Sequence, residues 1–160
     1  MWGISGHNKS PGLPILLSAA DGSTSQQWNL WPTTSDGKIV QIVNVNSGLC
    51  ADLTQDLQGA FLVQYTCKGK AEDWDNQRFT VIVGEDGRTN FSPVDFSDYR
   101  ITGGARNGRL LLQQFGGPNY DPNGNWNLLL QSVSSNWSAP WSRCVTRACF
   151  LANHNFVQVP

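Results

Sequence analysis

The chain has 160 residues, the usual length of one domain with one hydrophobic core, so we expect a single domain over residues 1–160. Only 14% of the residues are charged, the formal net charge is -1, and Lys and Arg form no run. The electrostatic attraction that dominates binding to nucleic acid or anionic lipid is therefore missing, and no apolar stretch approaches the roughly 18 residues of a membrane span. These features argue against nucleic acid as a partner and against membrane insertion.

Short apolar runs bounded by turn residues predict strands along the whole chain. In chain order these runs are residues 14–17, 38–45, 61–65, 79–83, 109–115 and 126–130. Pairs such as Asp36-Gly37 and Asn107-Gly108, which separate the runs, are typical of hairpin turns. Since no stretch of a dozen residues keeps a helical period, the sequence predicts an all-β fold.

A weak internal repeat indicates three copies of one unit. Residues 26–30, 77–81 and 125–129 each run amide, aromatic, polar, apolar, which places aromatic rings at positions 28, 79 and 126. Ahead of each lies another shared pair of blocks: 4–6 and 14–17, 50–52 and 62–65, 101–103 and 110–113. We expect repeats at about 1–31, 38–83 and 88–130, followed by a C-terminal segment, 131–160.

The repeated motif resembles the Q-x-W motif of ricin-type β-trefoil lectin domains. Gln26-Gln27-Trp28 fits it, Gln77-Arg78-Phe79 keeps the Gln, and Gly124-Asn125-Trp126 keeps only the Trp. The resemblance implies a β-trefoil in which the three aromatic rings fill the barrel near its pseudo-threefold axis, and we expect these rings to be structural.

The two ends of the chain depart from that family. The first repeat begins at its second strand, because Met1 stands only three residues before the block 4–6, while residues after 130 exceed the third repeat. Residues 155–159 alternate between polar and apolar, which is typical of a strand. We expect this tail to supply the missing first strand and to close the barrel.

Four cysteines allow three pairings, and their spacing in two close pairs suggests Cys50 with Cys67 and Cys144 with Cys149. A zinc site would need CxxC spacing or a nearby His, and the sequence has neither there. We expect disulfides, an oxidising compartment and a secreted protein, with no metal and no cofactor. A cytosolic lectin is the alternative, because the first residues do not form an export signal.

The best candidate site lies in the second repeat, where a sugar would meet both polar groups and an aromatic ring. The resemblance implies an Asp two residues after the first cysteine, an aromatic two before the second, and an Asn-Gln pair opening the motif. In this chain those positions are Asp52, Tyr65, Asn76 and Gln77. Asp52 would accept bonds from sugar hydroxyls, Asn76 would donate one, Tyr65 would stack on the ring, and Gln77 would brace Asp52 or the backbone.

A structural interpretation is also open for each of these residues. Asp52 could cap a turn with Thr54 and Asp56, and Tyr65 could be an ordinary strand residue. Trp74, between Asp73 and Asp75, either extends the site or packs locally.

The other repeats match less well. In the third repeat Thr102 falls near the acid position and Asn123-Gly124 replaces the Asn-Gln pair, although Phe115 is available for stacking. In the first repeat Ser5 and Leu16 or Leu17 fall where the acid and the ring belong. We expect one good site and at most one degenerate site.

The resemblance implies a lectin for glycans ending in galactose or N-acetylgalactosamine, on glycoproteins or glycolipids. A single shallow site binds sugars weakly, so an oligomer or a multivalent partner would be needed. An enzyme is not expected, because His7 and His154 are the only histidines and neither lies in a catalytic motif.

Two alternatives have other partners. The first is a recognition subunit of a larger assembly, such as a toxin, with Trp137 and Trp141 facing a partner protein. The second is a Kunitz-like β-trefoil protease inhibitor with Arg88, Arg106 or Arg143 on an exposed loop.

Overall fold

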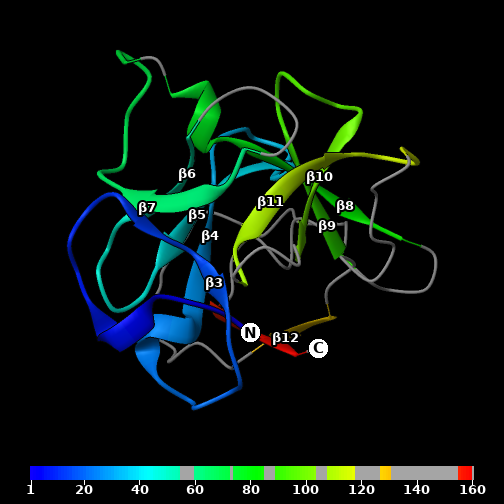
Figure 1. The fold of residues 1–160 in the computed structure, drawn as a ribbon. Coiled ribbons are helices and arrows are strands. Elements are labelled where there is room, and N and C mark those ends of the chain that lie inside the picture. The colour runs from blue at the N-terminus through cyan, green and yellow to red at the C-terminus, as the bar shows by residue number, and fades with distance from the viewer. Residues whose placement is uncertain are drawn as a thin grey trace.

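The computed structural model describes residues 1–54, 60–72, 74–84, 89–103 and 108–117, together with the backbone of two strands, Asn127–Leu130 and Asn155–Val159. In this part of the chain the regular structure consists of short antiparallel strands and three short 3-10 helices (Figure 1). The expected all-β class is confirmed.

The second repeat shows the structural unit most completely. It comprises β5 (Ile39–Asn44), β6 (Cys50–Leu53), β7 (Leu62–Tyr65) and β8 (Phe79–Val83), with the 3-10 helix η3 (Asp75–Gln77) directly before β8. Strands β6 and β7 form a hairpin, and β5 pairs with both β6 and β8. Because side chains alternate across a strand, Val40 and Ile42 of β5 and Phe79 of β8 reach the buried interior.

The third repeat has the same order of strands, and the first repeat has this order from its second strand on, with one strand divided in two. The third contains β9 (Thr89–Pro93), β10 (Tyr99–Gly103), β11 (Leu110–Gln114) and β12 (Asn127–Leu130). The first contains β1 (Trp2–Gly3), η1 (Ser5–His7), β2 (Leu13–Pro14), β3 (Leu16–Leu17), η2 (Thr24–Gln26) and β4 (Gln27–Pro32). The strand expected at residues 14–17 is thus divided at Ile15: β2 pairs with β7, whereas β3 pairs with β1.

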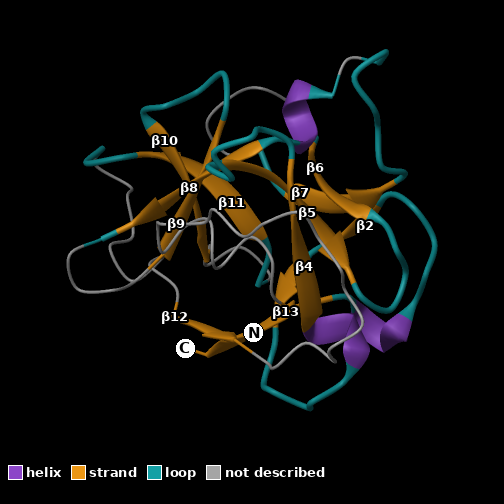
Figure 2. Ribbon diagram, turned by 180° about the vertical axis from the view of Figure 1, so that it is seen from behind, coloured by secondary structure: helices purple, strands orange, loops and turns teal. Residues whose placement is uncertain are grey.

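The C-terminal strand β13 (Asn155–Val159) lies between β12 and β4 and is antiparallel to both. In the second repeat, the first strand β5 pairs with the last strand of the preceding repeat, β4, and with the last strand of its own repeat, β8. Strand β13 has the corresponding partners, and both termini lie at the same end of the molecule (Figures 1 and 2). The tail therefore supplies the first strand of repeat one, as expected, while closure of the whole barrel and the exact repeat boundaries stay predictions.

The three repeats meet at three equivalent residues, Ile15, Leu62 and Leu110, which are fully buried. The residue directly before each of these three positions pairs with the residue directly after the equivalent position of the next repeat. These cross-repeat pairs are Pro14 with Val63, Phe61 with Leu111, and Arg109 with Leu16. The pairs define which positions of the three repeats correspond, independently of the sequence motifs.

Large aromatic side chains fill the interior. Trp28 and Phe79 are fully buried, which confirms the structural role expected for them, while Trp126 lies outside the described residues. Trp2, which the sequence did not assign, joins them: its carbonyl accepts a 3.2 Å hydrogen bond from Nε1 of Trp28, and its ring lies 5.6 Å from that of Phe91. The core thus draws on all three repeats.

Candidate functional site

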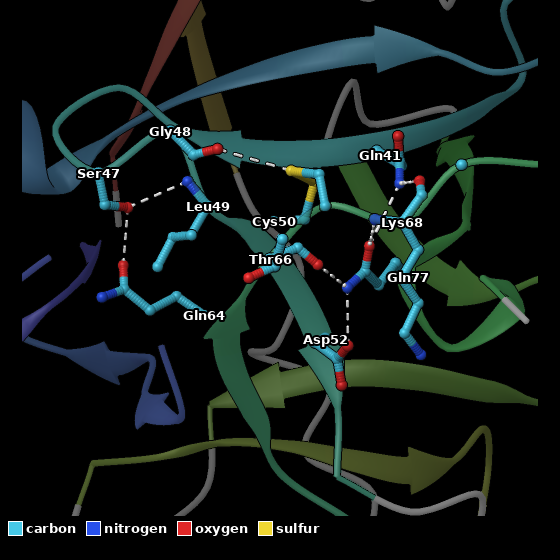
Figure 3. The surroundings of a disulfide bond; sticks show 12 residues. Gln41, Ser47, Gly48, Leu49, Cys50, Asp52, Gln64, Thr66, Lys68 and Gln77 are labelled. Carbon is cyan, nitrogen blue, oxygen red and sulfur yellow. Dashed lines mark hydrogen bonds between the residues drawn. A yellow bond between two sulfur atoms is a disulfide. The ribbon is translucent and has the colours of Figure 1, made fainter. Parts of the chain in front are cut away.

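The β6–β7 hairpin carries the acid and the ring that the sequence predicted. Cys50 faces Tyr65 and Asp52 faces Val63 in the ladder, so Asp52 and Tyr65 are diagonal neighbours on one face of the hairpin. The predicted disulfide between Cys50 and Cys67 is present and ties the end of this hairpin to the following loop (Figure 3). Tyr65 is 47% exposed, whereas Asp52 is 7% exposed.

Two side-chain amides of η3 hydrogen-bond the Asp52 carboxylate. Nδ2 of Asn76 donates to Oδ1 of Asp52 at 2.9 Å, and Nε2 of Gln77 donates to Oδ2 at 2.8 Å. These bonds join Asp52 to a different element of the chain, while Asp56 of the alternative turn cap lies outside the described residues. The four residues named by the motif are thus brought together, and Asp52, Asn76 and Gln77 contact one another directly.

Gln77 is fully buried and braces the loop that follows β7 (Figure 3). Its Oε1 accepts from the backbone N–H of Lys68 at 2.8 Å and from Nε2 of Gln41 at 3.3 Å. Its Nε2 also donates to the carbonyl of Thr66 at 2.9 Å. Gln77 therefore fixes Asp52 and the loop together, in the bracing geometry that the sequence predicted.

Burial raises the pKa of the Asp52 carboxyl above its ordinary value. The hydrogen bond from Gln77, the positive charge of Lys68 and the hydrogen bond from Asn76 act in the opposite direction, but they do not cancel the effect of burial. The site thus contains a weakly solvated carboxylate beside an exposed aromatic ring.

Lys68 is a member of the site that the sequence did not single out. Its Nζ donates to Oδ1 of Asn76 at 2.9 Å, and it lowers the pKa of Asp52 through its charge. Both N–H groups of Asn76 are engaged, one with Asp52 and one with the carbonyl of Leu53. Since an ammonium group has three donors, Lys68 keeps donors for a further partner. The available signal was its position directly after Cys67.

Trp74 lies just before η3 and is partly buried. The guanidinium of Arg78 lies 4.8 Å from the centre of its ring, and Arg78 also forms a 2.7 Å ion pair with Asp75. One face of the indole is therefore covered by a neighbouring cation. This contact belongs to local packing, while a role in extending the site stays a prediction.

The first repeat differs from the sequence-based alignment. Trp2 pairs with Leu17 in the first repeat, and Ala51 pairs with Gln64 in the second, so these two pairs are equivalent. One residue further along each strand, Gly3 is therefore the equivalent of Asp52, and Ser18 is the equivalent of Tyr65. Ser5 and Leu16 or Leu17, which we expected at these places, are displaced along the chain. The alignment was displaced because it matched the block 14–17 with 62–65 from Pro14 onward, whereas Ile15 is the residue equivalent to Leu62.

The third repeat places Thr102 opposite Leu111, as Asp52 lies opposite Val63, so Thr102 occupies the acid position as expected. Gln113, and not Phe115, corresponds to Tyr65, and Oγ1 of Thr102 donates to Oε1 of Gln113 at 2.7 Å. Phe115 is 58% exposed, and the Arg100 guanidinium lies 5.0 Å from its ring centre. Asn123-Gly124 lies outside the described residues.

Several other predicted residues also lie outside the described part: Asp56, Asp73, Arg88, Arg106, Trp137, Trp141, Arg143, Cys144, Cys149 and His154. Within the described ranges, no group of three or more His, Cys, Asp or Glu side chains is arranged to hold a metal ion. No helix in the described part has the length and apolarity needed to cross a bilayer.

Comparison with solved structures defines the class of the fold. The chain is similar to the designed threefold-symmetric protein ThreeFoil, with 20% identity and a TM-score of 0.61 over 74% of this chain and 84% of that one. It is also similar to part of a mosquitocidal holotoxin, with 17% identity and a TM-score of 0.63 over 78% of this chain and 15% of the toxin. An exo-beta-1,3-galactanase from Clostridium thermocellum matches with 24% identity and a TM-score of 0.58 over 73% of this chain and 25% of the enzyme. The fold is a β-trefoil.

A sequence profile identifies the family within this class. The profile described as ricin-type beta-trefoil lectin domain-like matches residues 2–65 and 24–114, which together span more than half of the chain. The chain belongs to this family, and membership supports carbohydrate binding in general. A search of the curated proteins found no significant match.

Proposed function

We propose that the protein is a lectin without enzymatic activity, and that its main glycan site lies in the second repeat around Asp52, Tyr65 and Lys68. The observation that carries this proposal is the amide-held carboxylate of Asp52 on the same hairpin face as the exposed ring of Tyr65. A sugar needs both a strong hydroxyl acceptor and a flat apolar surface at one place.

In the proposed mechanism the two carboxylate oxygens of Asp52 accept hydrogen bonds from neighbouring sugar hydroxyls. Each oxygen has one bond from an amide and retains further acceptor capacity, and bonds to a charged acceptor are the stronger kind. Tyr65 stacks on the face of the sugar ring. We assign the donor role to Lys68 instead of Asn76, because both N–H groups of Asn76 are already engaged.

The family resemblance favours terminal galactose or N-acetylgalactosamine as the sugar. A single site of this kind binds a monosaccharide with a Kd on the order of a millimolar. We therefore expect useful binding to require several sites together, through an oligomer or a multivalent glycan. The disulfide between Cys50 and Cys67 supports a secreted protein, because such bonds persist in oxidising compartments.

A glycan array tests the proposed site. We expect the wild-type protein to bind glycans ending in galactose or N-acetylgalactosamine, and Asp52→Ala to lose at least about tenfold in affinity, as expected when a charge-assisted bond is removed. Asp95→Ala is the matched control, since Asp95 is an exposed carboxylate outside the site. Equal binding by Asp52→Ala and wild type, or no glycan binding by the wild type, would reject the site.

A second candidate function is glycan recognition within a larger assembly. The mosquitocidal holotoxin and the galactanase each match this chain over only a small part of their own length. Such an arrangement places a β-trefoil beside other domains that carry a separate activity. Recovery of the native protein as a single species without associated chains, by size-exclusion chromatography and mass spectrometry, would argue against this candidate. A trypsin-inhibition assay separates both candidates from the Kunitz-like alternative. An inhibitor of that kind would block trypsin, whereas we expect this protein to leave trypsin active.

A further inference from the structure

The first repeat contains a cavity of about 250 Å³ between β1, β3, η1 and η2. It lies at the place that corresponds to the Asp52 site, where Gly3 stands instead of an acid. A Cβ atom on Gly3 would meet Cγ of Gln26 at 2.9 Å, so a side chain at this place is incompatible with the present position of Gln26. Gln26 therefore lies where the side chain of an acid would begin, and both residues belong to the lining of the cavity.

Gln26 braces this repeat in the same way as Gln77 braces the second. Its Oε1 accepts from the backbone N–H of Asp21 at 2.9 Å, and its Nε2 donates to the carbonyl of Ala19 at 2.7 Å. The corresponding partners of Gln77 are the N–H of Lys68 and the carbonyl of Thr66. Asp21 therefore stands where Lys68 stands in the second repeat, and it brings a carboxylate to the lining of the cavity.

His7 also lines the cavity and is held in an uncommon backbone conformation. Its φ of 54° lies in the left-handed region, which costs a non-glycine residue on the order of 1 kcal/mol and is concentrated at functional sites. Its Nδ1 lies 2.9 Å from Oγ of Ser25, which in turn lies 2.8 Å from Oγ of Ser23. This hydroxyl chain fixes the imidazole and, among the described residues, leaves its Nε2 without a partner.

We propose that this cavity binds an open-chain polyol, a ligand of the glycerol, erythritol or ribitol class. Each hydroxyl of a polyol is both a donor and an acceptor, and the lining offers the carboxylate of Asp21, the imidazole of His7 and the hydroxyl of Ser5. The apolar part of the lining, Ile4, Leu16 and Leu17, suits the C–H groups of such a chain. None of the described lining residues is Trp, Tyr or Phe, so the flat face of a pyranose has no ring to stack on.

The polyol site is independent of the proposed glycan site. It contains neither Asp52 nor Tyr65, and the acid reaches it from a loop and not from a strand. Its ligand is distinguished from a stacked sugar by the lining, which offers hydroxyl partners and aliphatic contacts but, among the described residues, no aromatic ring.

The test is a titration of the isotope-labelled full chain, followed by backbone amide chemical shifts. We expect erythritol to shift the amides of Gly3, Gly6 and Asp21 saturably, with a Kd of about 1 mM or weaker. Methyl β-galactopyranoside at the same concentrations should leave these amides unshifted. Absence of a saturable shift with erythritol, or an equal response to the galactoside, would overturn the proposal.

Variants locate the binding. His7→Gly removes the imidazole and suits the left-handed φ, so the fold should be retained, while erythritol affinity should fall about fivefold to tenfold. Asp21→Asn is a second variant, with a similar expected loss, and Lys9→Gly is the matched control outside the cavity. Wild-type erythritol affinity in a folded His7→Gly or Asp21→Asn protein would contradict the proposal. Asp52→Asn should leave erythritol binding unchanged, so failure of the glycan site is recognised separately.

Discussion

At the scale of single residues, Asp52 combines two opposing effects. Its carboxylate has little contact with water, which disfavours the charged form, yet both oxygens accept hydrogen bonds from side-chain amides that require a charged or otherwise accepting partner. Gln77 cannot turn away, because its own oxygen is bound to the backbone of Lys68. A protonated carboxyl would present its O–H to one of these amide donors. Binding through Asp52 is therefore tied to its ionised form.

We predict that glycan binding weakens on acidification at a higher pH than the titration of an ordinary aspartate would require. The pKa of Asp52 is raised, so the carboxyl takes up a proton at a higher pH than an ordinary aspartate, and glycan affinity falls as the pH falls through this value. Folding responds with the opposite sign: the folded state holds this proton more tightly than the unfolded state, so the contribution of Asp52 to stability is largest at low pH and is lost as the pH rises through the raised pKa.

Calorimetric titration and circular dichroism across pH 7 to 4 would measure both quantities. Glycan affinity that stays constant to the ordinary aspartate range, where exposed carboxylates titrate, would contradict the prediction.

Much of this site was accessible from the sequence, because Asp52, Tyr65, Asn76 and Gln77 stand at motif spacings. Lys68 was not, since its role depends on how the loop after β7 turns its Nζ toward Asn76. The cavity of the first repeat was also hidden. Its lining combines Gly3 with residues of η1, η2 and the loop at Asp21, and the register that places Gly3 there is fixed by pairing with β3 and not by local sequence.

At the scale of elements, the β6–β7 hairpin carries the site and depends on the Cys50–Cys67 bond at its open end. Apolar runs predicted β5, β7, β8, β11 and β12 because each of these strands is dominated by aliphatic or β-branched residues. They missed β1 and β4, and also β6, β9 and β10, where polar residues such as Asp52, Asn90 and Arg100 interrupt the run. Those strands are specified by their partners more than by their own composition.

We predict that Cys50→Ser/Cys67→Ser lowers the free energy of unfolding by about 3 kcal/mol, the value expected for a closed loop of this size. Glycan affinity should fall as well, because Tyr65 lies in the segment that the bond holds against β6. Urea unfolding followed by Trp fluorescence measures the stability, and Ser97→Ala, at an exposed serine away from the hairpin, is the control that keeps the bond. An unchanged unfolding midpoint in the double variant would show that the bond is dispensable.

At the scale of the whole molecule, three repeats share a core, and the third-repeat strand β12 is joined to the first-repeat strand β4 through β13. The sequence predicted this arrangement from the alternation of residues 155–159 and from the missing first strand. The repeat pattern was sufficient because a β-trefoil places like positions at like depths, as the burial of Trp28 and Phe79 shows.

We predict that removal of residues 143–160 unfolds the domain. Without β13, strands β12 and β4 lose the partner that joins them and expose two edges. Circular dichroism and thermal melting of the truncated chain would show a loss of β signal and of cooperative unfolding. A folded truncated protein that unfolds cooperatively on heating would contradict this prediction.

The position of β13 also orders events during synthesis. Trp28 of β4 pairs across the sheet with Phe156, so β4 must wait for residues 155–159, far along the chain, before this edge is paired. Chains grow at about 5 to 20 residues per second, slowly compared with the formation of a hairpin. The second repeat, whose strands are all close in the chain, is complete long before that. The nascent protein therefore exposes an unpaired edge of β4 for seconds, and this edge is where we expect chaperones to act or misassembly to begin.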